Sequence, residues 1–122
     1  IVDDDARNIF ALGKLLASQG VLIESATNGM MGVDKLRNMG PFDAVLMDIS
    51  MPVMDGLEAL AEIRADERFA ELPVIAVTAK AMAEDRRACM DAGASEYMSK
   101  PIEPTALLAM LQRWVQPERR SA

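Results

Sequence analysis

The sequence predicts an α/β domain of five βα units, doubly wound as a three-layer sandwich around a parallel five-stranded sheet. Its length of 122 residues suits one compact domain. Short, β-rich apolar runs alternate along it with longer segments whose apolar residues recur at helical spacing. The apolar runs are nearly continuous, which is typical of parallel strands buried on both faces, and right-handed crossovers then place helices on both sides of the sheet.

Five strands and five helices follow from this pattern. The strands are expected at residues 1–2, 21–26, 44–47, 74–78 and around 97–98, the first of them truncated at its start. The helices are expected at residues 6–19, 29–39, from 55, at 83–92 and from 104. Their boundaries rest on capping and turn residues. These are Gly20, Asn28, Asp55 with Glu58, Gly93 and Pro104.

Composition narrows the range of functions. The chain has no histidine, which removes imidazole catalysis, imidazole metal ligands and any phosphohistidine of its own. A net charge of −6 argues against a nucleic-acid partner, and the absence of a long apolar run argues against membrane contact. The single cysteine, Cys89, cannot form an intrachain disulfide and is expected to be inert. The domain is expected to span residues 1–116, with a polar tail or linker stub at 117–122.

The acidic residues are unevenly distributed. Residues 1–61 contain 9 acids and 4 bases, a balance of −5, whereas residues 62–122 contain 10 acids and 9 bases, a balance of −1. The first half therefore carries nearly all of the net charge. This asymmetry suggests that some carboxylates of the first half form a functional cluster.

Polar residues follow four of the predicted strands. They are Asp3, Asp4 and Asp5, then Asp48, then Thr78, and finally Lys100. Because the carboxyl ends of parallel strands meet at one edge of a sheet, these side chains are expected to come together there. Clustered carboxylates without histidine or cysteine favour Mg²⁺, with Mn²⁺ as the alternative. Asp5 is better explained as the cap of the first helix.

This set of residues is chemically complete for phosphoryl transfer to Asp48. A carboxylate held beside Mg²⁺ can attack a phosphoryl group and become an aspartyl phosphate. The Thr78 hydroxyl and the Lys100 ammonium can each stabilise one phosphoryl oxygen as charge develops.

Several motifs together resemble the response regulator receiver domain of two-component signalling, over essentially the whole chain. They are the segments 2–5, 46–56, 73–79, 93–94 and 97–102. The resemblance lies in their joint order and spacing, with 44 residues from Asp4 to Asp48, 30 more to Thr78 and 22 more to Lys100. Residues 5–12 are similar, more loosely, to the receiver modules of hybrid sensor histidine kinases.

The resemblance implies a flavodoxin-like sheet of strand order 2-1-3-4-5 and a magnesium site around the phosphoacceptor Asp48. Asp4 would ligate Mg²⁺ directly, with Asp3 nearby or acting through water, and the backbone carbonyl of Ser50 would be a further ligand. Lys100 would contact the phosphoryl group and form a cis peptide bond with Pro101.

The resemblance also implies a conformational switch. Thr78 and Tyr97 would move together on phosphorylation and change the surface of the fourth helix, fifth strand and fifth helix. Ser50 and Lys80 would overhang the site and tune the lifetime of the phosphoryl group. The donor would be a phosphohistidine on a histidine kinase or phosphotransfer domain. The expected location is cytoplasmic, including the cytoplasmic part of a membrane-bound sensor kinase.

Other functions remain open from the sequence. An aspartate-nucleophile, Mg²⁺-dependent hydrolase would also place an aspartate at a strand end, although it typically needs a second aspartate where this chain has Ser50. A flavin or nucleotide binder would need a phosphate loop where this chain has three acids. A degenerate receiver would lack the acids, Thr78 and Lys100. We therefore expect a signalling domain that promotes its own Mg²⁺-dependent phosphorylation and dephosphorylation and is not a turnover enzyme.

Overall fold

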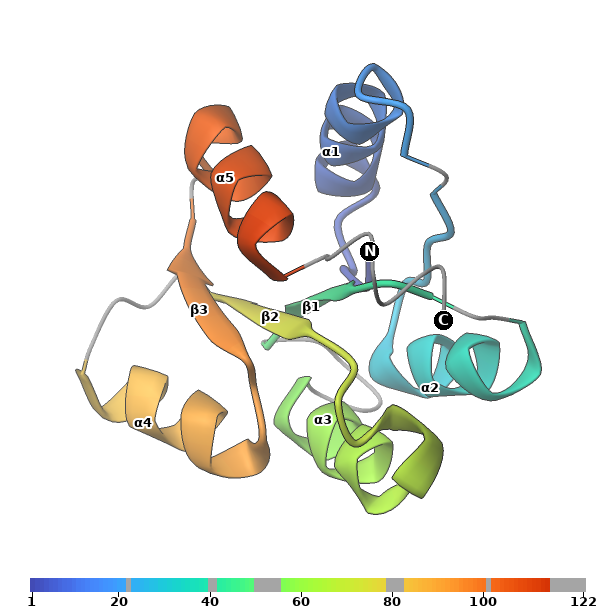
Figure 1. Ribbon diagram of the computed structural model, residues 1–122, viewed down its shortest axis with the longest axis vertical. Coiled ribbons are helices and arrows are strands. Elements are labelled where there is room, and N and C mark those ends of the chain that lie inside the picture. Colours follow the sequence, from blue (N-terminus) through green and yellow to red (C-terminus); the bar gives the residue numbers. More distant parts are fainter. Residues whose placement is uncertain (22, 40–41, 50–55, 79–82, 101, 115–122) are drawn as a thin grey trace.

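A parallel sheet lies between two layers of helices in the computed structural model (Figure 1). The structure describes residues 1–21, 23–39, 42–49, 56–78, 83–100 and 102–114. In chain order the elements are α1 (Ala6–Ala17), α2 (Gly29–Asn38), β1 (Val45–Asp48), α3 (Gly56–Ala65), the 3-10 helix η1 (Glu67–Phe69), β2 (Val74–Thr78), α4 (Ala83–Ala92), β3 (Glu96–Ser99) and α5 (Pro104–Trp114). None of the described helices is long and apolar enough to cross a membrane.

The sheet has the predicted strand order. Strands β1, β2 and β3 are adjacent and parallel, with Val45 opposite Val74 and Ile75 opposite Glu96. Val2 forms parallel bridges to Ala26 on one side and to Met47 on the other. The first predicted strand therefore lies beside β1 and the second lies beyond it, which gives the order 2-1-3-4-5. Among the described residues, each is reduced to a single bridged residue. After the Asp3 N–H bond to the Ala26 carbonyl, the chain turns into the α1 cap at Asp5.

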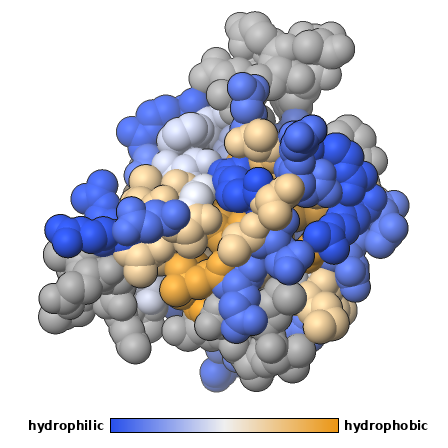
Figure 2. All heavy atoms as spheres, turned by 90° about the horizontal axis from the view of Figure 1, so that it is seen from below, coloured by the Kyte–Doolittle hydropathy of each residue, from blue (hydrophilic) through white to orange (hydrophobic). Residues whose placement is uncertain are grey.

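Apolar side chains fill both faces of the sheet. Successive residues of a strand point to opposite faces, so Leu46 and Ile75 pack toward α1 and α5, whereas Met47 and Ala76 pack toward α2, α3 and α4. Figure 1 shows these two helical layers above and below the strands. From the α2–α3–α4 side, apolar residues gather in a central band with hydrophilic ones around it (Figure 2). The prediction of a doubly wound α/β sandwich is confirmed.

Local capping explains where the helices begin and end. The Asp5 carboxylate accepts a hydrogen bond from the Arg7 backbone N–H at the start of α1, and the Asn28 side chain accepts one from the Met31 N–H at the start of α2. Gly93, just after α4, has a φ of 114°, the left-handed conformation expected of a helix-ending glycine. The predicted cap Asp55 lies outside the described residues.

Candidate functional site

The segment before α1 is held at the centre of the sheet by its backbone. The Val2 N–H donates to the Leu46 carbonyl at 2.8 Å, and the Asp48 N–H donates back to the Val2 carbonyl at 2.8 Å. The Asp3 N–H donates to the Ala26 carbonyl at 3.0 Å on the other side. These bonds bring Asp3 and Asp48, which are far apart in the sequence, to the same edge.

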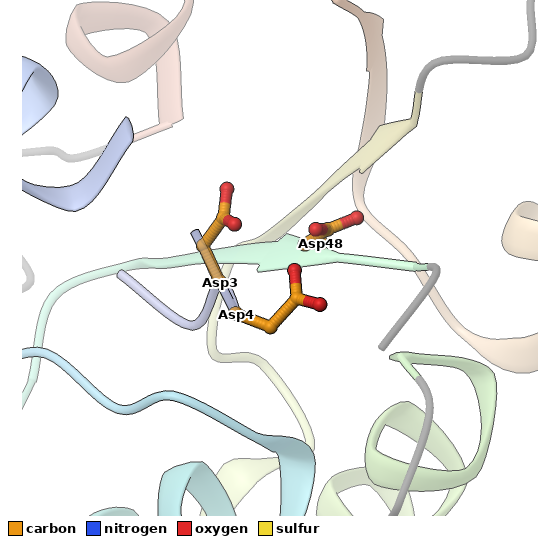
Figure 3. Close-up of side chains that lie close together, drawn as sticks. All are labelled: Asp3, Asp4 and Asp48. Atoms are coloured by element: carbon orange, nitrogen blue, oxygen red, sulfur yellow. The ribbon is translucent and has the colours of Figure 1, made fainter. Parts of the chain in front are cut away.

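Three carboxylates meet at this edge. Each of Asp3, Asp4 and Asp48 offers an oxygen, and these oxygens all lie within 4.8 Å of one another (Figure 3). Asp3 and Asp48 are buried, at 3% and 5% exposure, whereas Asp4 is exposed. Two buried carboxylates this close repel each other unless cations compensate them. The structure therefore brings together the three acids that the sequence singled out.

Lys100 supplies a positive charge to this cluster. Its Nζ atom lies 3.2 Å from Oδ2 of Asp48 and 3.5 Å from Oδ2 of Asp3. Its backbone N–H donates to the Thr78 carbonyl at 2.8 Å, which fixes the start of the side chain just beyond β3. Burial lowers the pKa of the Lys100 ammonium, but the carboxylates of Asp48 and Asp3 outweigh that effect and the net pKa is raised. Lys100 is therefore a cation at neutral pH.

Asp3 is further oriented by the first turn of α1. The Asp5 N–H donates to Oδ1 of Asp3 at 2.8 Å, and Nδ2 of Asn8 lies 3.4 Å from Oδ2. Sequence reasoning missed Asn8. The available signal was its place on the first turn of a helix that starts beside an aspartate pair.

Thr78 and Tyr97 lie on neighbouring strands and on the same face of the sheet. Tyr97 is opposite Ala76, and Thr78, two residues farther along β2, is opposite Ser99. Since side chains alternate along a strand, Thr78 shares the Ala76 and Tyr97 face, which is the face that α3 and α4 cover. Thr78 is buried and Tyr97 is half-buried. The two predicted switch residues thus lie on neighbouring strands at one face of the sheet, and their role as a switch stays a prediction.

Gly56 allows α3 to begin directly beside the end of β1. Its N–H donates to the Ile49 carbonyl at 2.9 Å. A Cβ atom at this position would contact the Asp48 carbonyl oxygen and would lie 2.6 Å from Cα of Ile49, and real Cβ atoms do not approach that closely. From the sequence, Gly56 was only the last residue of the motif at 46–56. The need for close approach became visible in the structure.

Other predicted residues fall outside this geometry. Ser50, Lys80 and Pro101 lie outside the described residues, so the carbonyl ligand, the lifetime positions and the cis peptide bond stay predictions. Cys89, expected to be inert, is buried at 1% exposure.

The residues present fit a hard divalent cation. Carboxylate oxygens are the ligands that Mg²⁺ prefers, and the exposed Asp4 leaves a side open for water. Asp4 and Asp48 would hold the ion directly, and Asp3, already engaged by Asp5, Asn8 and Lys100, would complete the charge balance. Fold and site together define an α/β domain with a cluster of carboxylates that fits a divalent cation at the carboxyl edge of a parallel sheet.

Comparison with known proteins gives the family. Residues 1–112 match the response regulator receiver domain, and the chain belongs to that family. It is 41% identical over 113 residues to the signal transduction histidine-protein kinase BarA of Escherichia coli K12, and 35% identical over 118 residues to the sensor histidine kinase CheAY of Helicobacter pylori. These matches cover 93% and 96% of this chain, but only 12% and 15% of the relatives.

A solved structure shows the same fold at similar identity. The receiver domain of sensor histidine kinase PA1611 from Pseudomonas aeruginosa is 37% identical with a TM-score of 0.86, each chain covered to 93%. In that protein a magnesium ion is coordinated in the active site cleft. The chain is thus a receiver domain of two-component phosphorelay signalling, as found in hybrid histidine kinases. The hydrolase alternative finds no support among these relatives.

Proposed function

We propose that Asp48 accepts the phosphoryl group. The observation that carries this proposal is the position of its carboxylate, buried at the end of β1, beside Asp3 and Asp4, with Lys100 at 3.2 Å. A nucleophilic carboxylate needs neighbouring cations to bring an anionic phosphoryl group close and to offset the charge of the transition state. The site provides one cation in Lys100 and the ligands for another.

The transfer begins when a carboxylate oxygen of Asp48 attacks phosphorus. A P–O bond forms as the P–N bond to the donor imidazole breaks, and the imidazole leaves with the electron pair and takes up a proton. Mg²⁺, when bound by Asp4 and Asp48, neutralises phosphoryl charge. Lys100 pairs with one phosphoryl oxygen, and Thr78 donates its hydroxyl to another. Mn²⁺, which has the same preference for oxygen ligands, would serve in its place.

The donor that we propose is a phosphohistidine on a histidine kinase or phosphotransfer domain. The absence of histidine from this chain supports a donor on another domain or another protein. The two kinases compared above are much longer than this chain, which supports a receiver module within a larger protein. We place this module at residues 1–116, followed by a linker from 117, on the cytoplasmic side. Output would pass through α4, β3 and α5.

Mass spectrometry tests the phosphoacceptor. The chain is incubated with Mg²⁺ and a small acyl phosphate donor, and intact mass is recorded for the wild type, Asp48→Asn and the control Asp34→Asn, which changes an exposed acid on α2. We expect one phosphoryl group on the wild type and the control and none on Asp48→Asn. Equal labelling of Asp48→Asn would overturn the assignment.

A further inference from the structure

Over residues 86–92, few side chains of helix α4 are buried against the domain. Among residues 86–92 only Cys89 is buried and Ala92 half-buried, and the others are exposed. In contrast, α3 buries Ala59, Leu60 and Ile63 almost completely. An element with so little apolar burial depends on other contacts for its position.

The C-terminal end of α4 is tied to α3 by Arg64. Its Nε donates to the Gly93 carbonyl at 2.8 Å, and its stem lies so close to Gly93 that a Cβ atom there would be 2.6 Å from Cγ. The same guanidinium donates to the Phe69 carbonyl at 2.7 Å and to Oγ of Ser95 at 3.1 Å. One side chain on a firmly buried helix thus joins η1, the turn after α4 and the residue before β3.

The start of β3 is held from both faces of the sheet. Ser95 Oγ also accepts a hydrogen bond from the Val74 N–H at 3.1 Å, while the Ser95 N–H donates to the Val74 carbonyl at 2.8 Å. On the other face, Arg113 and Trp114 of α5 both donate to Oε2 of the next residue, Glu96, at 3.1 and 3.3 Å. These contacts surround the end of β3 that lies away from the site.

The opposite end of β3 belongs to the site. Lys100 follows β3 directly and pairs with Asp48. In a parallel sheet, α4 leaves the edge where Thr78 lies and returns to the edge where β3 begins. Both α4 and β3 therefore have one end at the site and one end at the Arg64 contacts.

We propose that Arg64 makes the C-terminal end of α4 and the start of β3 a fixed pivot, so that phosphorylation of Asp48 displaces α4 only at the end near the site. This inference rests on the proposed function. Arg64 is a positioning residue here, because it touches neither the carboxylates nor a phosphoryl group. With this pivot, a small change at Thr78 rotates α4, while the C-terminal end of α4 stays attached to α3 through Arg64.

Amide hydrogen exchange of the whole chain tests the pivot. Exchange is measured with Mg²⁺ alone and with Mg²⁺ plus beryllofluoride as the phosphoryl analogue. The variants are Arg64→Lys, which keeps the charge but removes the several N–H donors of the guanidinium, and the control Arg68→Lys. The Arg68 guanidinium is exposed, pairs with Asp66 and lies over the Phe69 ring, and no described hydrogen bond joins it to residues 93–95. In the wild type and the control, beryllofluoride should change exchange in residues 83–90 several-fold and leave Gly93, Ala94 and Ser95 within twofold.

In Arg64→Lys, exchange at Gly93, Ala94 and Ser95 should rise about tenfold or more and should respond to beryllofluoride. A wild type in which residues 93–95 respond as strongly as residues 83–90 would overturn the pivot, and so would an Arg64→Lys pattern equal to that of the control. If Arg64→Lys does not fold, the comparison of residues 93–95 with residues 83–90 in the wild type still tests the pivot. No response to beryllofluoride anywhere in the wild type would instead overturn the proposed function, and the pivot with it.

Discussion

Nζ of Lys100 donates a hydrogen bond to Oδ2 of Asp48 across 3.2 Å, and the two residues come from different strand ends. Both carboxylates that Lys100 contacts are buried, so this ammonium offsets much of the repulsion between Asp48 and Asp3. Lys100 therefore stabilises the domain before any metal or phosphoryl group arrives. A later divalent cation has to share these carboxylates with it.

Replacing Lys100 with methionine should weaken the domain and strengthen its affinity for Mg²⁺. We expect a loss of about 1–3 kcal/mol in the free energy of unfolding without metal, less than for a fully buried pair because a quarter of the Lys100 side chain is exposed. Mg²⁺ should bind about tenfold tighter, because a competing positive charge is gone. Urea denaturation and calorimetric titration measure the two effects.

The matched control is Lys14→Met, which removes an exposed lysine that lies over the Phe10 ring. It should leave Mg²⁺ affinity unchanged. The proposed role also predicts that Lys100→Met is still phosphorylated but no longer changes the exchange of α4 residues 83–90. A variant that switches normally would contradict that role.

Replacing Asn8 with alanine should loosen Asp3. Among the described residues its amide is one of three donors to that carboxylate, and at 3.4 Å it makes a weak contact. We therefore expect Mg²⁺ affinity to fall by about two- to fivefold. Calorimetry measures the affinity. Asn38→Ala, which removes a side-chain bond within α2, is the control. Equal Mg²⁺ affinity in the two variants would mean that Asn8 has no part in the site.

Replacing Thr78 with valine preserves shape and removes the hydroxyl. Mg²⁺ affinity should stay within twofold, since Thr78 is not a ligand, whereas the rate of phosphorylation by a small donor should fall about ten- to a hundredfold. Thr78→Ser keeps the hydroxyl and should retain most of the rate. Intact-mass spectrometry of samples quenched at successive times follows the reaction. If valine and serine behave alike, the hydroxyl does not contact the phosphoryl group.

Replacing Gly56 with alanine should destabilise the domain by at least about 2 kcal/mol, because the new methyl group would overlap the backbone of Asp48 and Ile49. Gly13→Ala is the opposite control. Nothing lies within 4 Å of a Cβ at Gly13 inside α1, so this change should stabilise the domain by about 0.5–1 kcal/mol. Urea denaturation of both variants tests the contrast, and similar stabilities would refute the close approach.

Most of the fold could be predicted because apolar periodicity and turn residues indicate the same βα units that a parallel sheet requires. Alternating apolar runs located β2 at residues 74–78 and α4 at 83–92, as observed. The 3-10 helix η1 was missed, since a single turn of three residues is too short to show any periodicity. The helix α1 ends at Ala17, two residues before the predicted boundary, because the chain tightens into turns before Gly20, which has a φ of 81°.

The sequence predicted the part of the site whose residues directly follow strands. Asp3, Asp4 and Asp48 follow strands of one parallel sheet, so their meeting required only the topology. Gly56 and Asn8 were not predicted in their roles, because close approach and side-chain orientation depend on how α3 and α1 pack. The same holds for Arg64, whose partners come from three separate segments.

The position of Val2 at the centre of the sheet also has a consequence for folding kinetics. Its backbone pairs with Leu46 and Asp48 on one side and precedes the Asp3 bond to Ala26 on the other. The middle of the sheet, and with it the acidic cluster, can therefore form only after segments distant in the sequence have met. Such non-local pairing slows folding relative to a helical bundle of the same size. We expect the cation site to appear late in refolding, together with the closing of the central strand and not before it.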